Sequence, residues 1–219
     1  MYSIQNNLLI ALVLIFAYGC TSESEKGSRV STLPYYSEAS FTPHWFDDSS
    51  DSLLKFHEIP SFELINQHGE RVTKETVAGE VCVVDFFFTT CPGICPKMTN
   101  NMRLIQDQFT DEGVVLLSHT VTPEKDDVKT LKEYALNKGV TSKNWHLLTG
   151  DRDEIYTLGR KAYFVEEDLG LDKEVDEFLH TENFVLVDQN HHIRGIYNGL
   201  NKASINQLIA DIKTLKEDQ

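Results

Sequence analysis

Hydrophobic residues along the chain follow two different periods. Residues 81–88 and 114–118 are almost continuously apolar, which is typical of strands buried on both faces of a sheet. Residues 98–109 and 205–215 repeat their apolar side chains with the helical period, which predicts helices with one buried face. The chain therefore combines central strands with helices that cover them.

Further segments complete the predicted order of elements. Residues 61–73 and 183–197 each contain two short apolar runs about a polar turn, and both predict β-hairpins. A helix is expected from Thr122, as its cap, to Gly139, and another over 151–162, where the first residues have the spacing of a capping box. Strands separated by helices and followed by a terminal hairpin predict an α/β fold. We expect a thioredoxin-like mixed sheet flanked by helices, with an N-terminal β-hairpin extension.

The beginning of the chain has the composition of a targeting segment. Residues 8–17 form an apolar run that is shorter than the roughly 20 residues a spanning helix needs, but it fits the core of a secretory signal. The run ends at Gly19-Cys20, which resembles the lipobox of bacterial lipoproteins, whose cysteine carries the lipid. An uncleaved anchor is the alternative, because residues 1–7 contain no Lys or Arg.

We therefore expect three parts along the chain. Residues 1–19 are the predicted signal peptide, and residues 20–55 are a lipidated Cys20 followed by a flexible tether rich in Ser, Thr, Glu and Asp. Aromatic residues in the second half of the tether could pack on the domain. The thioredoxin-like domain is expected over 56–219.

The formal net charge of −14 limits the kinds of macromolecule that the chain can bind. Nucleic acids are excluded as partners because their binding relies on Lys and Arg side chains that neutralise phosphates. A basic protein surface suits this chain better. Residues 166–177 hold seven acids and one Lys. They predict either a solvated loop or a docking surface for a basic partner.

Cys91 and Cys95 stand four positions apart, where the strand over 81–88 gives way to a helix. A helix N-terminus stabilises thiolates, so this pair could bind a soft metal ion or cycle between dithiol and disulfide. Cys82 lies within the strand and is expected to be a buried, inert thiol.

Topology narrows the choice of a third ligand among eight histidines. The strand over 183–188 should run antiparallel to the central strand, which places His180, just before it, near the cysteines. His119 ends a parallel strand at the same edge and is the alternative ligand, or else a histidine at the edge of the core. His191 and His192 should lie at the far end of the sheet.

The segment from Phe86 to Met98, Phe-Phe-Phe-Thr-Thr-Cys-Pro-Gly-Ile-Cys-Pro-Lys-Met, resembles the signature of the Sco/SenC family of copper proteins. Leu179-His180-Thr181 is similar to the segment that holds the family's copper-binding histidine. The resemblance implies one copper ion bound by Cys91, Cys95 and His180.

The resemblance also implies what the site does. It implies a metallochaperone that delivers copper to the CuA site of a cytochrome c oxidase subunit, or that keeps the cysteines of that site reduced. With the predicted lipid anchor, the protein is expected to be an exported lipoprotein of the bacterial cell membrane, facing the periplasm or the exterior.

Other interpretations stay open at this point. A thiol–disulfide oxidoreductase is the main enzymatic alternative, although the spacing is C-x-x-x-C and no proline follows Pro123. A peroxidase, a copper sensor and a zinc site are further alternatives. Met98 and Met102 could supply thioether ligands, but their helical stripe with Ile105 favours a role in the core.

Overall fold

The computed structural model describes residues 27–46, 51–110, 112–165, 179 and 181–217. Its elements, in chain order, are η1 (Leu53–Lys55), β1 (Glu63–Asn66), β2 (Arg71–Thr73), η2 (Glu75–Val77), β3 (Val81–Phe87), α2 (Cys95–Gln108), β4 (Val114–Thr120), α3 (Val128–Lys138), β5 (Trp145–Thr149), α4 (Arg152–Thr157), the π-helix η3 (Leu158–Ala162), β6 (Asn183–Val187), β7 (Ile193–Asn198) and α5 (Lys202–Glu217).

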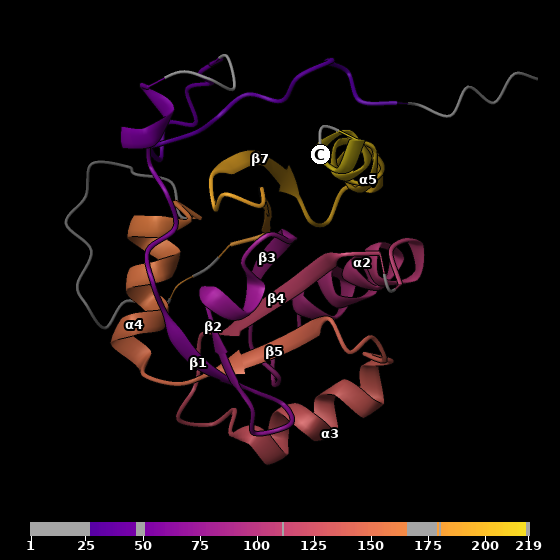
Figure 1. Cartoon of the computed structure of the whole chain (residues 1–219). Helices are drawn as coiled ribbons and strands as arrows, with labels where there is room; N and C mark the ends of the chain where they lie inside the picture. The colour runs from indigo at the N-terminus through magenta and orange to yellow at the C-terminus, as the bar shows by residue number, and fades with distance from the viewer. Residues whose placement is uncertain (1–26, 47–50, 111, 166–178, 180, 218–219) are drawn as a thin grey trace, which may run out of the picture.

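The strands form one seven-stranded sheet in the order β2-β1-β5-β4-β3-β6-β7 (Figure 1). Strands β3, β4 and β5 are parallel, whereas β1, β6 and β7 pair antiparallel with their neighbours. This confirms the predicted mixed sheet, including the N-terminal hairpin β1–β2. The order also places the start of β6 beside the carboxyl end of β3.

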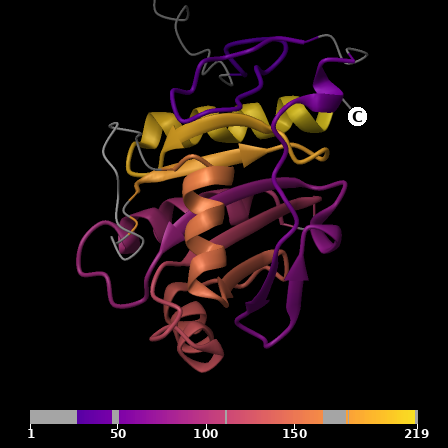
Figure 2. The ribbon, with the colours of Figure 1, turned by 90° about the vertical axis from the view of Figure 1, so that its left-hand side faces the viewer.

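Helices cover both faces of the sheet. On one face α2, α3 and α5 enclose a core that includes Met98, Leu131 and Ile205. On the other face α4 and η3 cover a second core with Ile155, and α4 crosses in front of the strands in Figure 2. All seven residues of β3 are buried, as its unbroken apolar run predicts.

The expected helix start at Thr122 is wrong. Helix α3 begins at Val128, and Asp127 caps it by accepting a hydrogen bond from the N–H of Thr130 at 2.8 Å. The helix ends as predicted at Gly139, whose φ of 72° favours glycine. The hydroxyl of Thr122 is instead engaged with the buried carboxylate of Asp126.

The predicted helix over 151–162 exists but changes its geometry part-way. Asp151 caps the helix by accepting the N–H of Glu154 at 2.9 Å, but the Glu154 carboxylate accepts the N–H of Glu63 and so does not complete a capping box. From Leu158 onward the turns widen into the π-helix η3. Such segments occur often beside functional sites.

Part of the expected flexible tether over 20–55 packs on the domain. Leu33 and Tyr35 are buried, and Tyr36 pairs with Ile193 at the start of β7. The segment lies along the β7 side of the sheet in both views (Figures 1 and 2). Packing of the aromatic residues Tyr35 and Tyr36 agrees with the expectation that the second half of the tether packs on the domain.

A buried arginine holds this segment in place. Arg194 forms an ion pair with Asp188 at 2.9 Å and donates to the carbonyl oxygens of Leu33 at 2.6 Å and Pro34 at 3.1 Å. Its guanidinium also lies 3.8 Å from the centre of the Tyr35 ring. One side chain therefore joins the N-terminal segment to β7 through charge, hydrogen bonds and a cation–π contact.

The predicted signal peptide over 1–19 and the predicted lipid anchor Cys20 lie outside the described residues. Within the part of the chain that the structure describes, no helix has both the length and the hydrophobicity to span a bilayer.

Replacing Arg194 with alanine should destabilise the domain by roughly 3–5 kcal/mol, because it leaves the Asp188 carboxylate buried without its cation. Urea unfolding measures the change. The control is Arg71→Ala, which breaks the exposed ion pair with Glu63 and should cost less than about 1 kcal/mol. Equal unfolding midpoints for the two variants would contradict the role assigned to Arg194.

Candidate metal centre

Cys91 and Cys95 lie at the carboxyl end of the central strand. β3 ends at Phe87, a short loop carries Cys91, and α2 begins at Cys95. The N–H of Cys91 donates to the carbonyl of Phe88 at 3.3 Å. Cys91 is partly exposed, whereas Cys95 is 4% exposed and packs in the core. One thiol of the pair is therefore partly exposed and the other is buried.

The two thiols differ in their affinity for a proton. Partial burial would raise the pKa of Cys91, but hydrogen bonds from the Cys95 thiol and from the N–H groups of Cys95, Gly93 and Ile94 outweigh it and lower the pKa. Burial and the interaction with Cys91 raise the pKa of Cys95 to about 12. Cys91 is thus the more acidic thiol of the pair, and N–H groups at the start of α2 contribute to this difference.

The buried side of the pair is fixed by packing and hydrogen bonds. Cys95 belongs to the same core as Met98 and Met102, which are both fully buried. This agrees with the expected role of the two methionines in core packing. The hydroxyl of Thr99 donates to the carbonyl of Cys95 at 2.9 Å and contacts the hydroxyl of Tyr134 at 2.8 Å.

His119, the alternative ligand, points to the opposite face of the sheet. Its ring stacks on Phe86 with centroids 4.9 Å apart and packs in the core beneath α4, whereas Cys95 lies in the core beneath α2. Burial lowers the pKa of His119 to about 4, despite the nearby carbonyls of Asp85 and Leu117. Neither ring nitrogen makes a well-formed hydrogen bond with a described residue. His119 is therefore a core histidine.

His180, the predicted third ligand, lies outside the described residues. Its neighbour Leu179 is 2% exposed and packs in the core beneath α4. A Cβ atom on Gly159 of η3 would lie 2.6 Å from Leu179 Cδ1 and 3.1 Å from Phe86 Cε1, so glycine makes room for this leucine. β6 follows at once, with Val185 opposite Val84 of β3.

The remaining histidines do not join the pair. His191 and His192 follow β6 at the other end of the sheet, as predicted, where His192 Nδ1 contacts the carbonyl of His57 at 2.8 Å. Cys82 is buried, and its burial raises the pKa to about 12, as expected for an inert thiol. In the described ranges, no group of three His, Cys, Asp or Glu side chains could hold a metal ion.

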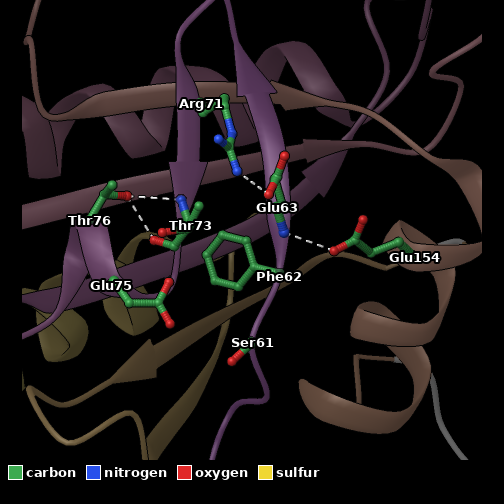
Figure 3. A pocket seen from close by; sticks show the side chains of 8 residues that line it. All are labelled: Ser61, Phe62, Glu63, Arg71, Thr73, Glu75, Thr76 and Glu154. Atoms are coloured by element: carbon green, nitrogen blue, oxygen red, sulfur yellow. Dashed lines mark hydrogen bonds and ion pairs between the residues drawn. The ribbon is translucent and has the colours of Figure 1, made fainter.

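A pocket of about 630 Å³ opens at another place, beside the β1–β2 hairpin (Figure 3). Glu63 and Arg71 form an ion pair on its wall, and the carboxylate of Glu154 accepts the N–H of Glu63 at 2.9 Å. Neither Cys91 nor Cys95 lines it. The pocket is therefore separate from the candidate centre.

A family model described as SCO1/SenC matches residues 50–217. The chain belongs to the SCO1/SenC family. It is 34% identical over 163 residues to the SCO1 protein homolog of Bacillus subtilis (strain 168), which covers 72% of this chain and 82% of that protein. Residues 33–36, which pack on the domain, precede the residues matched by the family model.

Solved structures of the SCO1/SenC family share the fold. A SCO1/SenC family lipoprotein from Bacillus anthracis str. Ames has a TM-score of 0.64 at 29% identity, covering 73% of this chain and 95% of that one. BsSco, a member of the Sco family of cytochrome c oxidase assembly proteins in which a disulfide switch was identified, has a TM-score of 0.63 at 33% identity. That match covers 74% of this chain and 95% of BsSco.

Sequence reasoning missed two buried carboxyl groups near the pair. Asp85 lies within the apolar run of β3, accepts the Ser118 hydroxyl at 2.5 Å, and burial raises its pKa to about 7. An acid inside a continuous apolar run was the available signal. Asp126 accepts hydrogen bonds from the loop that carries Cys91. The sequence signal for Asp126 was weaker, because only its spacing of four residues from Thr122 indicates a local contact.

Cys91 should react with iodoacetamide well before Cys95, because the thiolate is the nucleophile and Cys91 is both the lower-pKa and the more exposed thiol. Partial alkylation of the reduced chain at neutral pH, followed by peptide mass spectrometry, measures the order. Cys82 serves as the internal control and should stay unmodified in the folded protein. Faster labelling of Cys95 would contradict the assignment.

Replacing His119 with leucine should make the free energy of unfolding less sensitive to acid. The folded pKa of about 4 lies below the ordinary value of 6.5, so the neutral ring stabilises the fold above pH 6.5. That contribution is lost as the pH falls through 4, and amounts to ~3 kcal/mol. Urea unfolding at pH 7.5 and at pH 4.5 should show a smaller loss for His119→Leu than for the wild type. The same loss in both proteins would exclude this role.

Proposed function

We propose that this chain is a copper metallochaperone that binds one copper ion through Cys91, Cys95 and His180 and delivers it to the CuA site of a cytochrome c oxidase subunit. The observation that carries the proposal is the place of both cysteines at the carboxyl end of β3, with Cys91 in the loop and Cys95 as the first residue of α2. BsSco, a relative that is 33% identical, is described as a cytochrome c oxidase assembly protein.

The donor set fits copper. Thiolates are soft ligands that favour Cu(I), and the Sco/SenC resemblance implies copper at these two cysteines. The support for His180 is its place in the sequence, between the buried Leu179 and the strand β6 that enters the sheet next to β3. Two thiolates and one imidazole leave Cu(I) with a low coordination number, so a partner's ligands can attack it.

Cys91 and Cys95 would have different roles in copper binding and release. Cys91 offers a thiolate at the surface, and Cys95 gives up its proton to solvent when it binds the ion. Release reverses these steps, since Cys95 recovers a proton as the copper passes to the partner's ligands. The raised pKa of Cys95 therefore opposes very tight binding and favours transfer.

Thiol–disulfide exchange is a second candidate function, favoured by the two free thiols of different acidity at the start of α2 and by the disulfide switch identified in BsSco. The Cys91 thiolate would attack a partner's disulfide, forming a mixed disulfide and releasing one partner thiolate. Cys95, once deprotonated, would then attack Cys91 Sγ and release the second. Two electrons pass to the partner, whose cysteines end reduced, while Cys91 and Cys95 end as a disulfide.

The proposed location is the outer face of a bacterial cell membrane, with lipidated Cys20 as the anchor and the domain facing the periplasm or the exterior. The apolar run over 8–17 and Gly19-Cys20 support export and lipidation. The related Bacillus anthracis protein is itself described as a lipoprotein.

Anaerobic titration of the reduced chain from residue 21 onward should give one Cu(I) per chain. Cys91→Ser and Cys95→Ser should abolish tight binding, because each removes one of two soft ligands. His180→Ala should weaken it by about tenfold or more, which corresponds to ~1.4 kcal/mol. Competition with a chromophoric Cu(I) chelator measures the affinities.

Two matched variants serve as controls for the titration. His119→Leu and Cys82→Ser change a histidine and a cysteine that lie in the core beneath α4, and both should bind copper like the wild type. A folded, fully reduced protein that binds no copper would refute the metallochaperone function. Thiol–disulfide exchange at Cys91 and Cys95 would then be the remaining candidate.

A further inference from the structure

Asp126 is a fully buried carboxylate that is held by four hydrogen bonds from uncharged donors. Thr89 donates twice, through its hydroxyl to Oδ1 at 2.5 Å and through its N–H to Oδ2 at 3.1 Å. The hydroxyls of Thr120 and Thr122 donate to Oδ2 at 2.5 and 3.0 Å. We call these four residues the Asp126 cage.

The cage joins two segments that meet at the carboxyl edge of the sheet. Thr120 is the last residue of β4, and Thr122 lies two positions after it. Thr89 lies on the other segment, in the loop between β3 and α2, two positions before Cys91. The carboxylate therefore connects the end of β4 to the loop that presents Cys91.

The burial of this carboxyl group argues for a specific role. A buried polar group is costly unless its hydrogen bonds are satisfied, and here four donors satisfy it. Two of the four hydrogen bonds come from Thr89, one of them from its backbone N–H. The carboxyl group therefore attaches the backbone of Thr89 firmly to the end of β4.

Rigidity at Thr89 bears directly on the cysteine pair. The N–H of Cys91 donates a hydrogen bond to the carbonyl of Phe88. Hydrogen bonds therefore fix the backbone at both Thr89 and Cys91. The position of the Cys91 sulfur relative to the start of α2 thus depends on where Thr89 is held. A displacement of Thr89 would shift the Cys91 sulfur relative to the start of α2, where Cys95 is the first residue of the helix.

We propose that Asp126 is a positioning residue for the cysteine pair, because its carboxylate fixes Thr89 against the end of β4 and so holds Cys91 Sγ beside Cys95 Sγ. This inference rests on the proposed function for the meaning of that geometry. The Asp126 cage would support both candidate functions, because copper binding and disulfide formation each need the two sulfurs close together.

The cage offers a matched pair of variants. Thr89→Val and Thr120→Val each remove one hydroxyl that lies 2.5 Å from the same carboxylate and keep the side chain's shape. Thr89→Val acts on the cysteine loop, whereas Thr120→Val acts on β4 and also removes an acceptor of the Thr122 N–H. If the cage only stabilises the fold, Thr120→Val should have the larger effect on every measurement.

The experiment compares the wild type with both variants in full-length, detergent-solubilised protein. Equilibration in glutathione buffers, followed by acid quenching and mass spectrometry, gives the equilibrium constant for forming the Cys91–Cys95 disulfide. Chelator competition gives the Cu(I) affinity, and thermal unfolding gives the stability.

Thr89→Val should lower both the disulfide constant and the Cu(I) affinity by about tenfold, because looser positioning lowers the effective concentration of one sulfur at the other. Thr120→Val should lower the unfolding temperature at least as much, yet change neither constant by more than about twofold. Thr89→Ser keeps the hydroxyl. It should therefore have the disulfide constant and the Cu(I) affinity of the wild type.

Equal effects of the two valine variants on the constants, or wild-type constants in Thr89→Val, would overturn the positioning role. The two proposals fail in different ways. A wild type without Cu(I) binding refutes the metallochaperone function, and the disulfide constant then still tests the cage.

Discussion

The burial of β3 on both faces is the constraint from which the site follows. All seven residues of β3 are buried, so the chain reaches the surface only at the two ends of the strand. Its carboxyl end lies between β4 and β6. The chain must turn there and return over one face as α2. Cys91 lies in that turn and Cys95 is the first residue of the helix, so packing of the central strand places both sulfurs at one edge.

The start of α2 then gives the site its chemistry. A helix begins with N–H groups that have no partner within the helix, and at α2 no side-chain oxygen caps them. Hydrogen bonds from the Cys95 thiol and from N–H groups at the start of α2 lower the pKa of Cys91. The start of the helix therefore makes Cys91 the more acidic thiol of the pair.

Local patterns predicted the elements better than they predicted the faces. The apolar runs of β3 and β4 identify buried strands, but a continuous run carries no alternation and so cannot say which side chains share a face. His119 was placed correctly at the carboxyl edge of the sheet, yet its ring lies on the opposite face from the core of Cys95. Thr122 carries a local capping signal that a tertiary contact with Asp126 overrides. The contacts of Arg194 with residues 33–35 join positions about 160 apart, beyond any local pattern.

The buried ionisable groups near the cysteines show how the fold tolerates them. Asp126 is surrounded by four donors, whereas Asp85 and His119, on opposite faces of the sheet, are stabilised in their neutral forms. Their effects on stability have opposite signs. The raised pKa of Asp85 gives stability below pH 3.8 that is lost as the pH rises through 7, whereas the lowered pKa of His119 gives stability that is lost as the pH falls from 6.5 through 4. Between these limits the two contributions oppose each other, so the stability lost at His119 on acidification is offset in part by the stability gained at Asp85.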